Sequence, residues 1–124
     1  MVEISIKYPL SRETALELRE QVMAVVLDSL KSVHTHDEGF SLNFGRESTI
    51  IKALSQMIEI ERVVNPFLRM TLIVESNQGP IKLELSGPAG TREFLITEFG
   101  LKRWPVCTQK TVQGEIWQRR QKKS

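Results

Sequence analysis

Two runs of alternating apolar and polar residues, separated by a short polar turn, constrain the fold of this chain more than any other feature. Residues 67–75 place Leu, Met, Leu and Val at every second position, and residues 81–85 alternate Ile, Leu and Leu with Lys and Glu. Such period-two alternation is typical of strands with one buried face. Because Asn, Gln, Gly and Pro occupy residues 77–80, the pattern predicts an antiparallel hairpin.

The rest of the chain predicts further strands and helices. Apolar residues at every second position predict strands, and apolar residues at steps of three and four predict helices. The predicted strands are 2–8 and 40–44, and the polar residues 34–39 are predicted to form a loop. Three helices are predicted: one over residues 12–32, one that is capped by Glu47 or Ser48 and ends at residue 64, and a short one that is capped by Thr91 and ends at Gly100. Ser11 is expected to cap the first helix, and Glu13 suits its first turn.

This order of elements predicts the fold class. We expect an α+β protein, a two-layer sandwich in which helices cover one face of a mixed or antiparallel sheet of about four strands. The predicted order is β-α-β-α-β-β-α, followed by a basic C-terminal tail. With 124 residues, the chain is expected to form one domain over residues 1–101, and residues 102–124 form the tail.

Charge divides the chain in the same way. Residues 1–101 hold 10 Lys and Arg against 14 Asp and Glu, whereas residues 102–124 hold 7 Lys and Arg and a single acid, Glu115. The chain has 40% hydrophobic and 26% charged residues, which is typical of a globular protein. No apolar stretch approaches the roughly 20 residues that cross a bilayer, so no membrane association is expected. The first residues lack a secretion signal and Cys107 is the only cysteine, which favours a cytoplasmic location.

The segment from His34 to Glu38 is one candidate site. His34, His36 and Asp37 offer imidazole and carboxylate groups, which are ordinary ligands of divalent metals and ordinary general bases. The alternative is a hydrated loop between a helix and a strand. No third histidine completes a metal site, so the sequence predicts no cofactor, and the metal-dependent enzyme is the second alternative for function.

The basic tail is the other candidate. It mixes two indoles with cations, a combination that allows bases to stack while phosphates meet Lys and Arg. The predicted nucleic-acid contacts are Lys102, Arg103, Trp104, Lys110, Trp117, Arg119 and Arg120. The alternative is that the apolar residues of this segment dock on the domain as a final strand. Nucleic-acid binding through the tail is therefore the first alternative for function.

The first half of the chain resembles the histidine-containing phosphocarrier HPr family of the sugar phosphotransferase system. Residues 9–15, Pro-Leu-Ser-Arg-Glu-Thr-Ala, are similar to the Gly-Leu-His-x-Arg-Pro-Ala segment of that family, and residues 47–50, Glu-Ser-Thr-Ile, are similar to its Lys-Ser-Ile-Met segment. The resemblance implies an HPr-like fold. It does not imply histidine phosphotransfer, because Ser11 stands where the phosphorylated histidine would be.

The patterns together favour a non-enzymatic function. Core burial accounts for the strong periodicities, and no set of catalytic residues stands out beside them. We therefore predict a protein-interaction or regulatory module whose partner is another protein or a second copy of the chain. An exposed apolar surface on the sheet, or a homodimer in solution, would favour this prediction.

Overall fold

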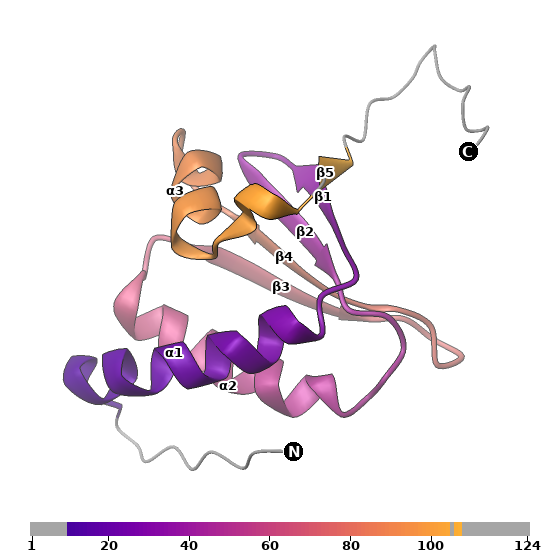
Figure 1. Cartoon of the computed structure of the whole chain (residues 1–124), viewed down its shortest axis with the longest axis horizontal. Helices are drawn as coiled ribbons and strands as arrows, with labels where there is room; N and C mark the ends of the chain where they lie inside the picture. The colour runs from indigo at the N-terminus through magenta and orange to yellow at the C-terminus, as the bar shows by residue number, and fades with distance from the viewer. Residues whose placement is uncertain (1–9, 105, 108–124) are drawn as a thin grey trace.

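The computed structural model describes residues 10–104 and 106–107, and the strand predicted at 2–8 lies outside them. Three helices, one short 3-10 helix and five strands follow one another along this part of the chain (Figure 1). Their bounds are α1 Arg12–Asp28, β1 Ser32–His36, β2 Gly39–Asn43, α2 Ile50–Val64, β3 Arg69–Val74, β4 Ile81–Ser86, α3 Thr91–Glu98, η1 Leu101–Arg103 and β5 Val106–Cys107.

The strands form one sheet in the order β3-β4-β2-β1-β5. Strands β1 to β4 pair antiparallel, and β5 adds to β1 in parallel. The helices pack on one face of this sheet, and α1 lies alongside α2 (Figure 1). This arrangement confirms the predicted α+β fold, with helices on one face of a largely antiparallel sheet.

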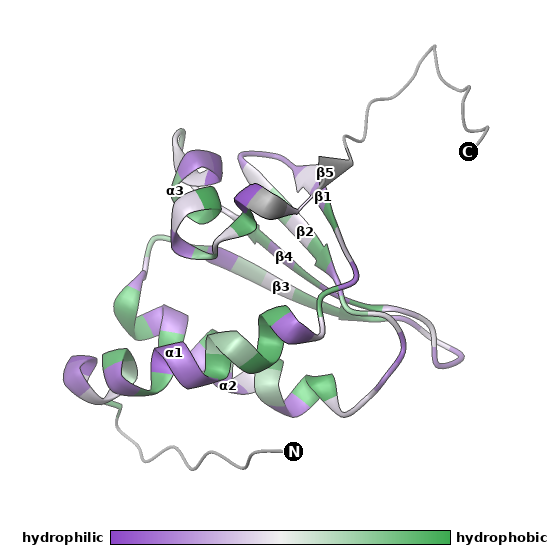
Figure 2. Cartoon of the chain, in the orientation of Figure 1, coloured by the Kyte–Doolittle hydropathy of each residue, from purple (hydrophilic) through white to green (hydrophobic). Residues whose placement is uncertain are grey.

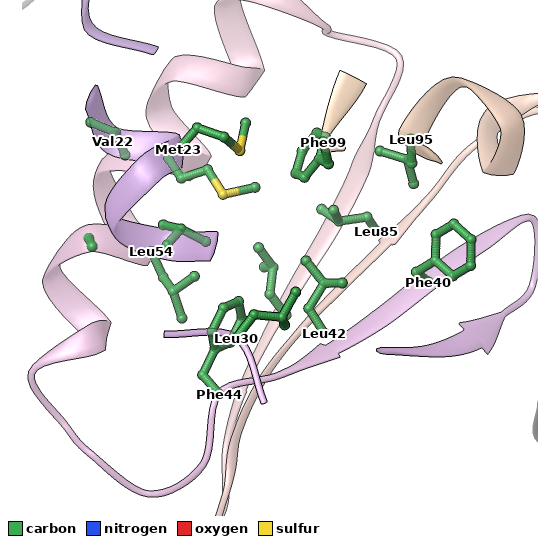
Figure 3. Close-up of a cluster of buried hydrophobic side chains, with 14 of the residues drawn as sticks. Val22, Met23, Leu30, Phe40, Leu42, Phe44, Leu54, Leu85, Leu95 and Phe99 are labelled. Carbon is green, nitrogen blue, oxygen red and sulfur yellow. The ribbon is translucent and has the colours of Figure 1, made fainter. Parts of the chain in front are cut away.

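The core follows from the alternation along the strands. Leu42 of β2 is opposite Leu83 of β4, Phe40 is opposite Leu85, and these side chains are buried. Directly paired residues point to the same face of a sheet, so the apolar positions of neighbouring strands form one surface. Figure 3 shows Phe40, Leu42 and Leu85 gathered with Leu95 and Phe99, at the end of α3, and with Met23 of α1. The described residues share this single core cluster.

The hairpin from β3 to β4 is confirmed. Met70, Leu72 and Val74 are opposite Leu85, Leu83 and Ile81, so the even-numbered residues of β3 face the helices as predicted. Asn77 and Gln78 have φ angles of 57° and 56°, and the N–H of Gly79 donates to the carbonyl oxygen of Ser76 at 3.0 Å. Two central residues with positive φ match the turn geometry that suits the twist of a hairpin.

The first helix begins where the sequence predicts and ends earlier. The side chain of Ser11 accepts a hydrogen bond from the N–H of Thr14 at 3.1 Å, and Glu13 lies in the first turn. Figure 2 shows hydrophobic and hydrophilic segments alternating along α1, as expected for a helix with one buried face. The predicted end at residue 32 is wrong, because α1 ends at Asp28 and Val33 is buried in a strand.

The prediction of a loop at 34–39 is also wrong. Residues 32–36 form β1, and β2 starts at Gly39, so the connection shrinks to Asp37 and Glu38. Val33 faces the core, whereas His34 and its neighbours on the same side face away from the helices. A polar strand is stable here because an antiparallel sheet can leave one face in water.

The predicted caps of the later helices are shifted by one or two residues. Helix α2 starts at Ile50 after Thr49, not after Glu47 or Ser48, and Thr49 makes no capping hydrogen bond through its side chain. Helix α3 follows Gly90, and Thr91, which was predicted to cap it, is its first residue. The Thr91 hydroxyl instead donates to the carbonyl oxygen of Pro88 at 2.6 Å.

Candidate functional site

The sheet surface opposite the helices, called the open face below, carries mainly polar side chains. They lie in register across the strands, because paired residues point to the same side. One row consists of Ser32, Asn43, Lys82 and Ile73, and the next consists of His34, Ser41, Glu84 and Thr71. The open face therefore gathers residues from four strands that are far apart in the sequence.

A hollow of about 200 Å³ lies on the open face. Its lining comes from three neighbouring strands, β1, β2 and β4. The lining residues are His34, Thr35, His36, Ser41, Asn43, Lys82 and Glu84. This hollow combines two imidazoles, a cation, a carboxylate and neutral hydrogen-bonding groups.

His36 contacts two carboxylates, that of Asp37 in the β1–β2 turn and that of Glu84 on β4. Its Nε2 atom lies 3.4 Å from Oε1 of Glu84 and 3.6 Å from Oδ2 of Asp37. The contact with Glu84 passes over β2, where Gly39 is the register partner of His36. Because glycine has no side chain, the imidazole and the carboxylate can approach each other above this strand. Asp37 itself has a φ of 47°, and its carbonyl oxygen accepts a hydrogen bond from Arg92 of α3.

His34 has a different environment on the same strand. Its Nε2 atom is 3.4 Å from the hydroxyl oxygen of Ser32. Partial burial lowers the pKa of His34 below its ordinary value of 6.5, and the nearby ammonium group of Lys82 lowers it further. Both effects disfavour the protonated imidazole. His34 is therefore held in its neutral form more strongly than a histidine in water.

The lowered pKa of His34 predicts a pH dependence of stability. Between the lowered pKa of the folded state and 6.5, the unfolded chain binds more protons at His34 than the folded chain. The free energy of unfolding should therefore decrease as the pH falls through 6.5, until the folded imidazole is also protonated. Urea unfolding measures this change. When the pH is lowered from about 8 to about 5, the free energy of unfolding should decrease less in His34→Gln than in the wild type.

Two further variants test this assignment. Lys82→Met should raise the pKa of His34 toward 6.5 in an NMR titration, since it removes the neighbouring cation. His36→Gln is the matched control, because His36 lies on the same strand and face. This substitution should leave the titration of His34 largely unchanged. An unchanged His34 pKa in Lys82→Met would contradict the role of the ammonium group.

The structure brings the two predicted histidines together on the open face, although as strand residues. Within the described part of the chain, no group of three or more His, Cys, Asp or Glu side chains is arranged to hold a metal ion. The sequence prediction did not include Ser41, Asn43, Lys82 and Glu84. Their period-two positions on neighbouring strands were the available signal, and the missing information was which strands are neighbours.

The predicted nucleic-acid contacts lie mostly outside the described residues. Lys110, Trp117, Arg119 and Arg120 are among residues 108–124, and Arg103 ends η1. Lys102 is exposed, whereas Trp104 is partly buried and packs against the core. Trp104 is therefore engaged with the domain, and stacking of bases by the remaining tail residues stays a prediction.

The outer edge of β3 is the second surface of interest. Strand β3 pairs with β4 on one side, and no strand among residues 10–104 and 106–107 pairs with its other side. Just beyond β3, the N–H of Glu75 donates to the carbonyl oxygen of Pro80, which precedes β4. Ile81, the β4 residue opposite Val74, instead bonds away from β3: its N–H donates to the carbonyl oxygen of Gly45, and its carbonyl oxygen accepts from the N–H of Phe44. Because this pattern alternates along an antiparallel strand, the backbone groups of Met70, Leu72 and Val74 point away from β4.

Several features that commonly protect an exposed strand edge are missing from β3, which carries one charged residue, Arg69, at its start. Proline, lysine and bulges usually hinder the addition of another strand. The six residues of β3 include neither Pro nor Lys, and they pair with β4 in an uninterrupted register. Val74, at the end of the strand, is 55% exposed. The edge therefore offers backbone hydrogen-bonding groups beside exposed apolar surface.

Comparisons of the chain with protein family models, with curated proteins and with solved structures found no match. The resemblance of residues 9–15 and 47–50 to the HPr family therefore stays a prediction. Among the described residues, no helix is long and apolar enough to cross a membrane.

Proposed function

We propose that this protein is a non-enzymatic interaction module that binds another polypeptide by strand addition at the outer edge of β3. The observation that carries the proposal is the row of outward-directed backbone groups on Met70, Leu72 and Val74. An added strand would satisfy these groups and extend the sheet, which is a common mode of peptide recognition.

The side chains along this edge support the same mode of binding. Met70 and Leu72 are partly buried on the side of the helices, and Val74 is largely exposed there. On the open face, Arg69 and Thr71 are exposed, and Ile73 is partly buried. A strand that adds to this edge would therefore meet an apolar row on one side and a mixed row on the other. Main-chain hydrogen bonds would provide affinity, and these two rows would provide specificity.

The test is selection of short peptides against the full-length protein, followed by NMR. Random eight-residue peptides are displayed, the binders are synthesised, and amide hydrogen exchange is measured on the labelled protein at low concentration. Binders should slow exchange at the amides of Met70, Leu72 and Val74, because these become hydrogen-bonded. Peptides that bind while these three amides keep their exchange rates, or the absence of any binder, would reject strand addition.

Two substitutions at Val74 provide the matched control. Val74→Pro removes one outward N–H donor and places a ring on the edge, but it leaves the hydrogen bonds between β3 and β4 intact. Val74→Thr keeps the N–H and a β-branched side chain. Peptide binding should be lost in Val74→Pro and retained in Val74→Thr.

A further inference from the structure

We propose that the strand added at this edge is β3 of a second copy of the chain, paired antiparallel with Leu72 opposite Leu72 of the partner subunit. This inference rests on the proposed function, and it names the partner and the register. The two copies would be related by a two-fold axis, as in most homodimers. Here the axis would be perpendicular to the sheet. The two sheets would then continue into one another, with the helices of both copies on the same side.

Backbone geometry selects this register. Antiparallel strands bond through pairs of opposite residues that exchange two hydrogen bonds, and these pairs occur at every second position. The outward-directed residues of β3 are Met70, Leu72 and Val74. With Leu72 at the axis, each of the three meets an outward-directed residue of the partner subunit, so the whole row is paired. If the axis passed through Thr71 instead, Val74 would be opposite a residue that precedes β3 of the partner subunit, so Val74 would have no outward-directed β3 residue to pair with.

The side chains on the side of the helices also favour this register, because it places apolar residues opposite one another. Leu72 would face the partner's Leu72, and Met70 would face the partner's Val74. Met70 and Leu72 are partly buried and Val74 is 55% exposed in the single chain. Pairing would therefore remove apolar surface from water and extend the core surface of each sheet across the axis.

Charge complementarity is the most specific feature of this register. On the open face, Thr71 would face the partner's Ile73, and Arg69 would face Glu75 of the partner subunit. Arg69 and Glu75 are both exposed, and among the described residues neither takes part in an ion pair. The two-fold axis produces this pair twice, once at each end of the interface. Opposite charges in directly paired positions stabilise antiparallel strands.

Within one chain the same two residues are too far apart to interact. They are six positions apart along an extended chain, which corresponds to about 20 Å. This distance is well beyond the screening length of about 8–10 Å at ordinary salt concentrations. An energetic coupling between Arg69 and Glu75 would therefore report on contact between two copies.

The experiment is analytical ultracentrifugation of the full-length chain over a range of concentrations, with a charge swap. The wild type should show a concentration-dependent dimer. Arg69→Glu and Glu75→Arg should each weaken the dimer roughly tenfold, because each places like charges opposite one another twice. The double variant Arg69→Glu/Glu75→Arg restores opposite charges and should regain the affinity of the wild type. Val74→Pro should be monomeric, and Val74→Thr should dimerise.

Each other outcome overturns the inference. A dimer that is unaffected by the charge variants would have another register or surface. A chain that stays monomeric would exclude the second copy as occupant. If the amides of Met70, Leu72 and Val74 are protected in such a monomer at every concentration, the occupant is a segment of the same chain, for which residues 2–8 are the predicted strand.

The failure of this inference can be distinguished from the failure of the proposed function. A monomer in which selected peptides slow exchange at the three outward amides keeps strand addition and rejects the homodimer. A dimer that forms while these amides stay unprotected also rejects the proposed homodimer, because it would use a different surface. Strand addition is rejected separately, when the selected peptides fail to slow exchange at the three amides.

Discussion

Replacing Arg19 with methionine is expected to lower the free energy of unfolding by about 3–5 kcal/mol, because the change leaves a buried carboxylate without its cation. Glu61 of α2 is fully buried, with 0% exposure, and Arg19 of α1 is its cationic partner. The Arg19 guanidinium donates to both oxygens of this carboxylate, at 2.6 and 3.4 Å. It also lies 3.4 Å from Glu98 and 5.7 Å from the centroid of Phe99. One side chain therefore connects α1 with α2 and the end of α3.

The measurement is urea unfolding at a fixed protein concentration, since association would shift the apparent stability. Arg12→Met is the matched control, because Arg12 lies on the same helix and is exposed, and within the described part of the chain its side chain donates one hydrogen bond, to the carbonyl oxygen of Val64. The control should change stability by less than about 0.5 kcal/mol. Equal losses in the two variants would contradict the importance of the buried pair.

A double variant separates the pair from its surroundings. In Arg19→Met/Glu61→Leu, both charges are replaced by apolar groups, so no carboxylate remains buried and unpaired. Buried ion pairs replaced in this way often lose little stability or gain some. Asn65, which donates to Glu61 at 2.8 Å, is partly exposed and can turn to water. The double variant should therefore be more stable than Arg19→Met alone.

The sequence predicts those elements whose apolar residues recur at the period expected for a strand or helix with one buried face. The hairpin of β3 and β4 was predicted because its apolar residues alternate over two runs joined by turn residues. The second helix was predicted from an apolar stripe that continues for four turns. In both cases the local pattern agrees with the tertiary environment. Only the elements that pack against the hairpin and the helix could not be predicted from the local pattern.

Strand β1 shows where this reasoning fails. His34 and His36 are polar, and a polar stretch after a helix is typical of a loop. These residues form a strand because β2 and β5 pair with β1 on both sides and because the open face tolerates polar groups. The two histidines could therefore be chosen as a candidate site from the sequence. Their partners Lys82 and Glu84 could not, since the order of strands brings together residues more than 40 positions apart.

The Arg19–Glu61 pair has a weak sequence signal. Glu61 follows Met57 by four residues, so it lies on the apolar stripe of the second helix, where a charge needs a partner. That signal predicts that some cation is nearby. It cannot identify Arg19, which is 42 residues earlier and becomes a neighbour only because α1 packs against α2.

Gly39→Ala is expected to lower the free energy of unfolding by about 3 kcal/mol, near the upper end of the range for overpacked sites. A Cβ atom at this position would lie 1.8 Å from the carbonyl oxygen of Leu85 and 3.0 Å from Cα of Ser86. Both are backbone atoms of β4, so no side chain can rotate away to make room. The two strands must separate at this end, which also breaks the hydrogen-bond ladder between them.

A second glycine isolates this steric effect from backbone conformation. Gly100 has a φ of 62°, and a Cβ atom there would meet nothing within 4 Å, so Gly100→Ala should cost about 1–2 kcal/mol from the left-handed conformation alone. Gly39 is not left-handed, so its larger loss must come from the contact with β4. Separation of β2 from β4 should also pull Glu84 away from His36, and the NMR signals of that imidazole would then shift. If Gly39→Ala unfolds no more easily than Gly100→Ala, the close approach of these two strands is wrong.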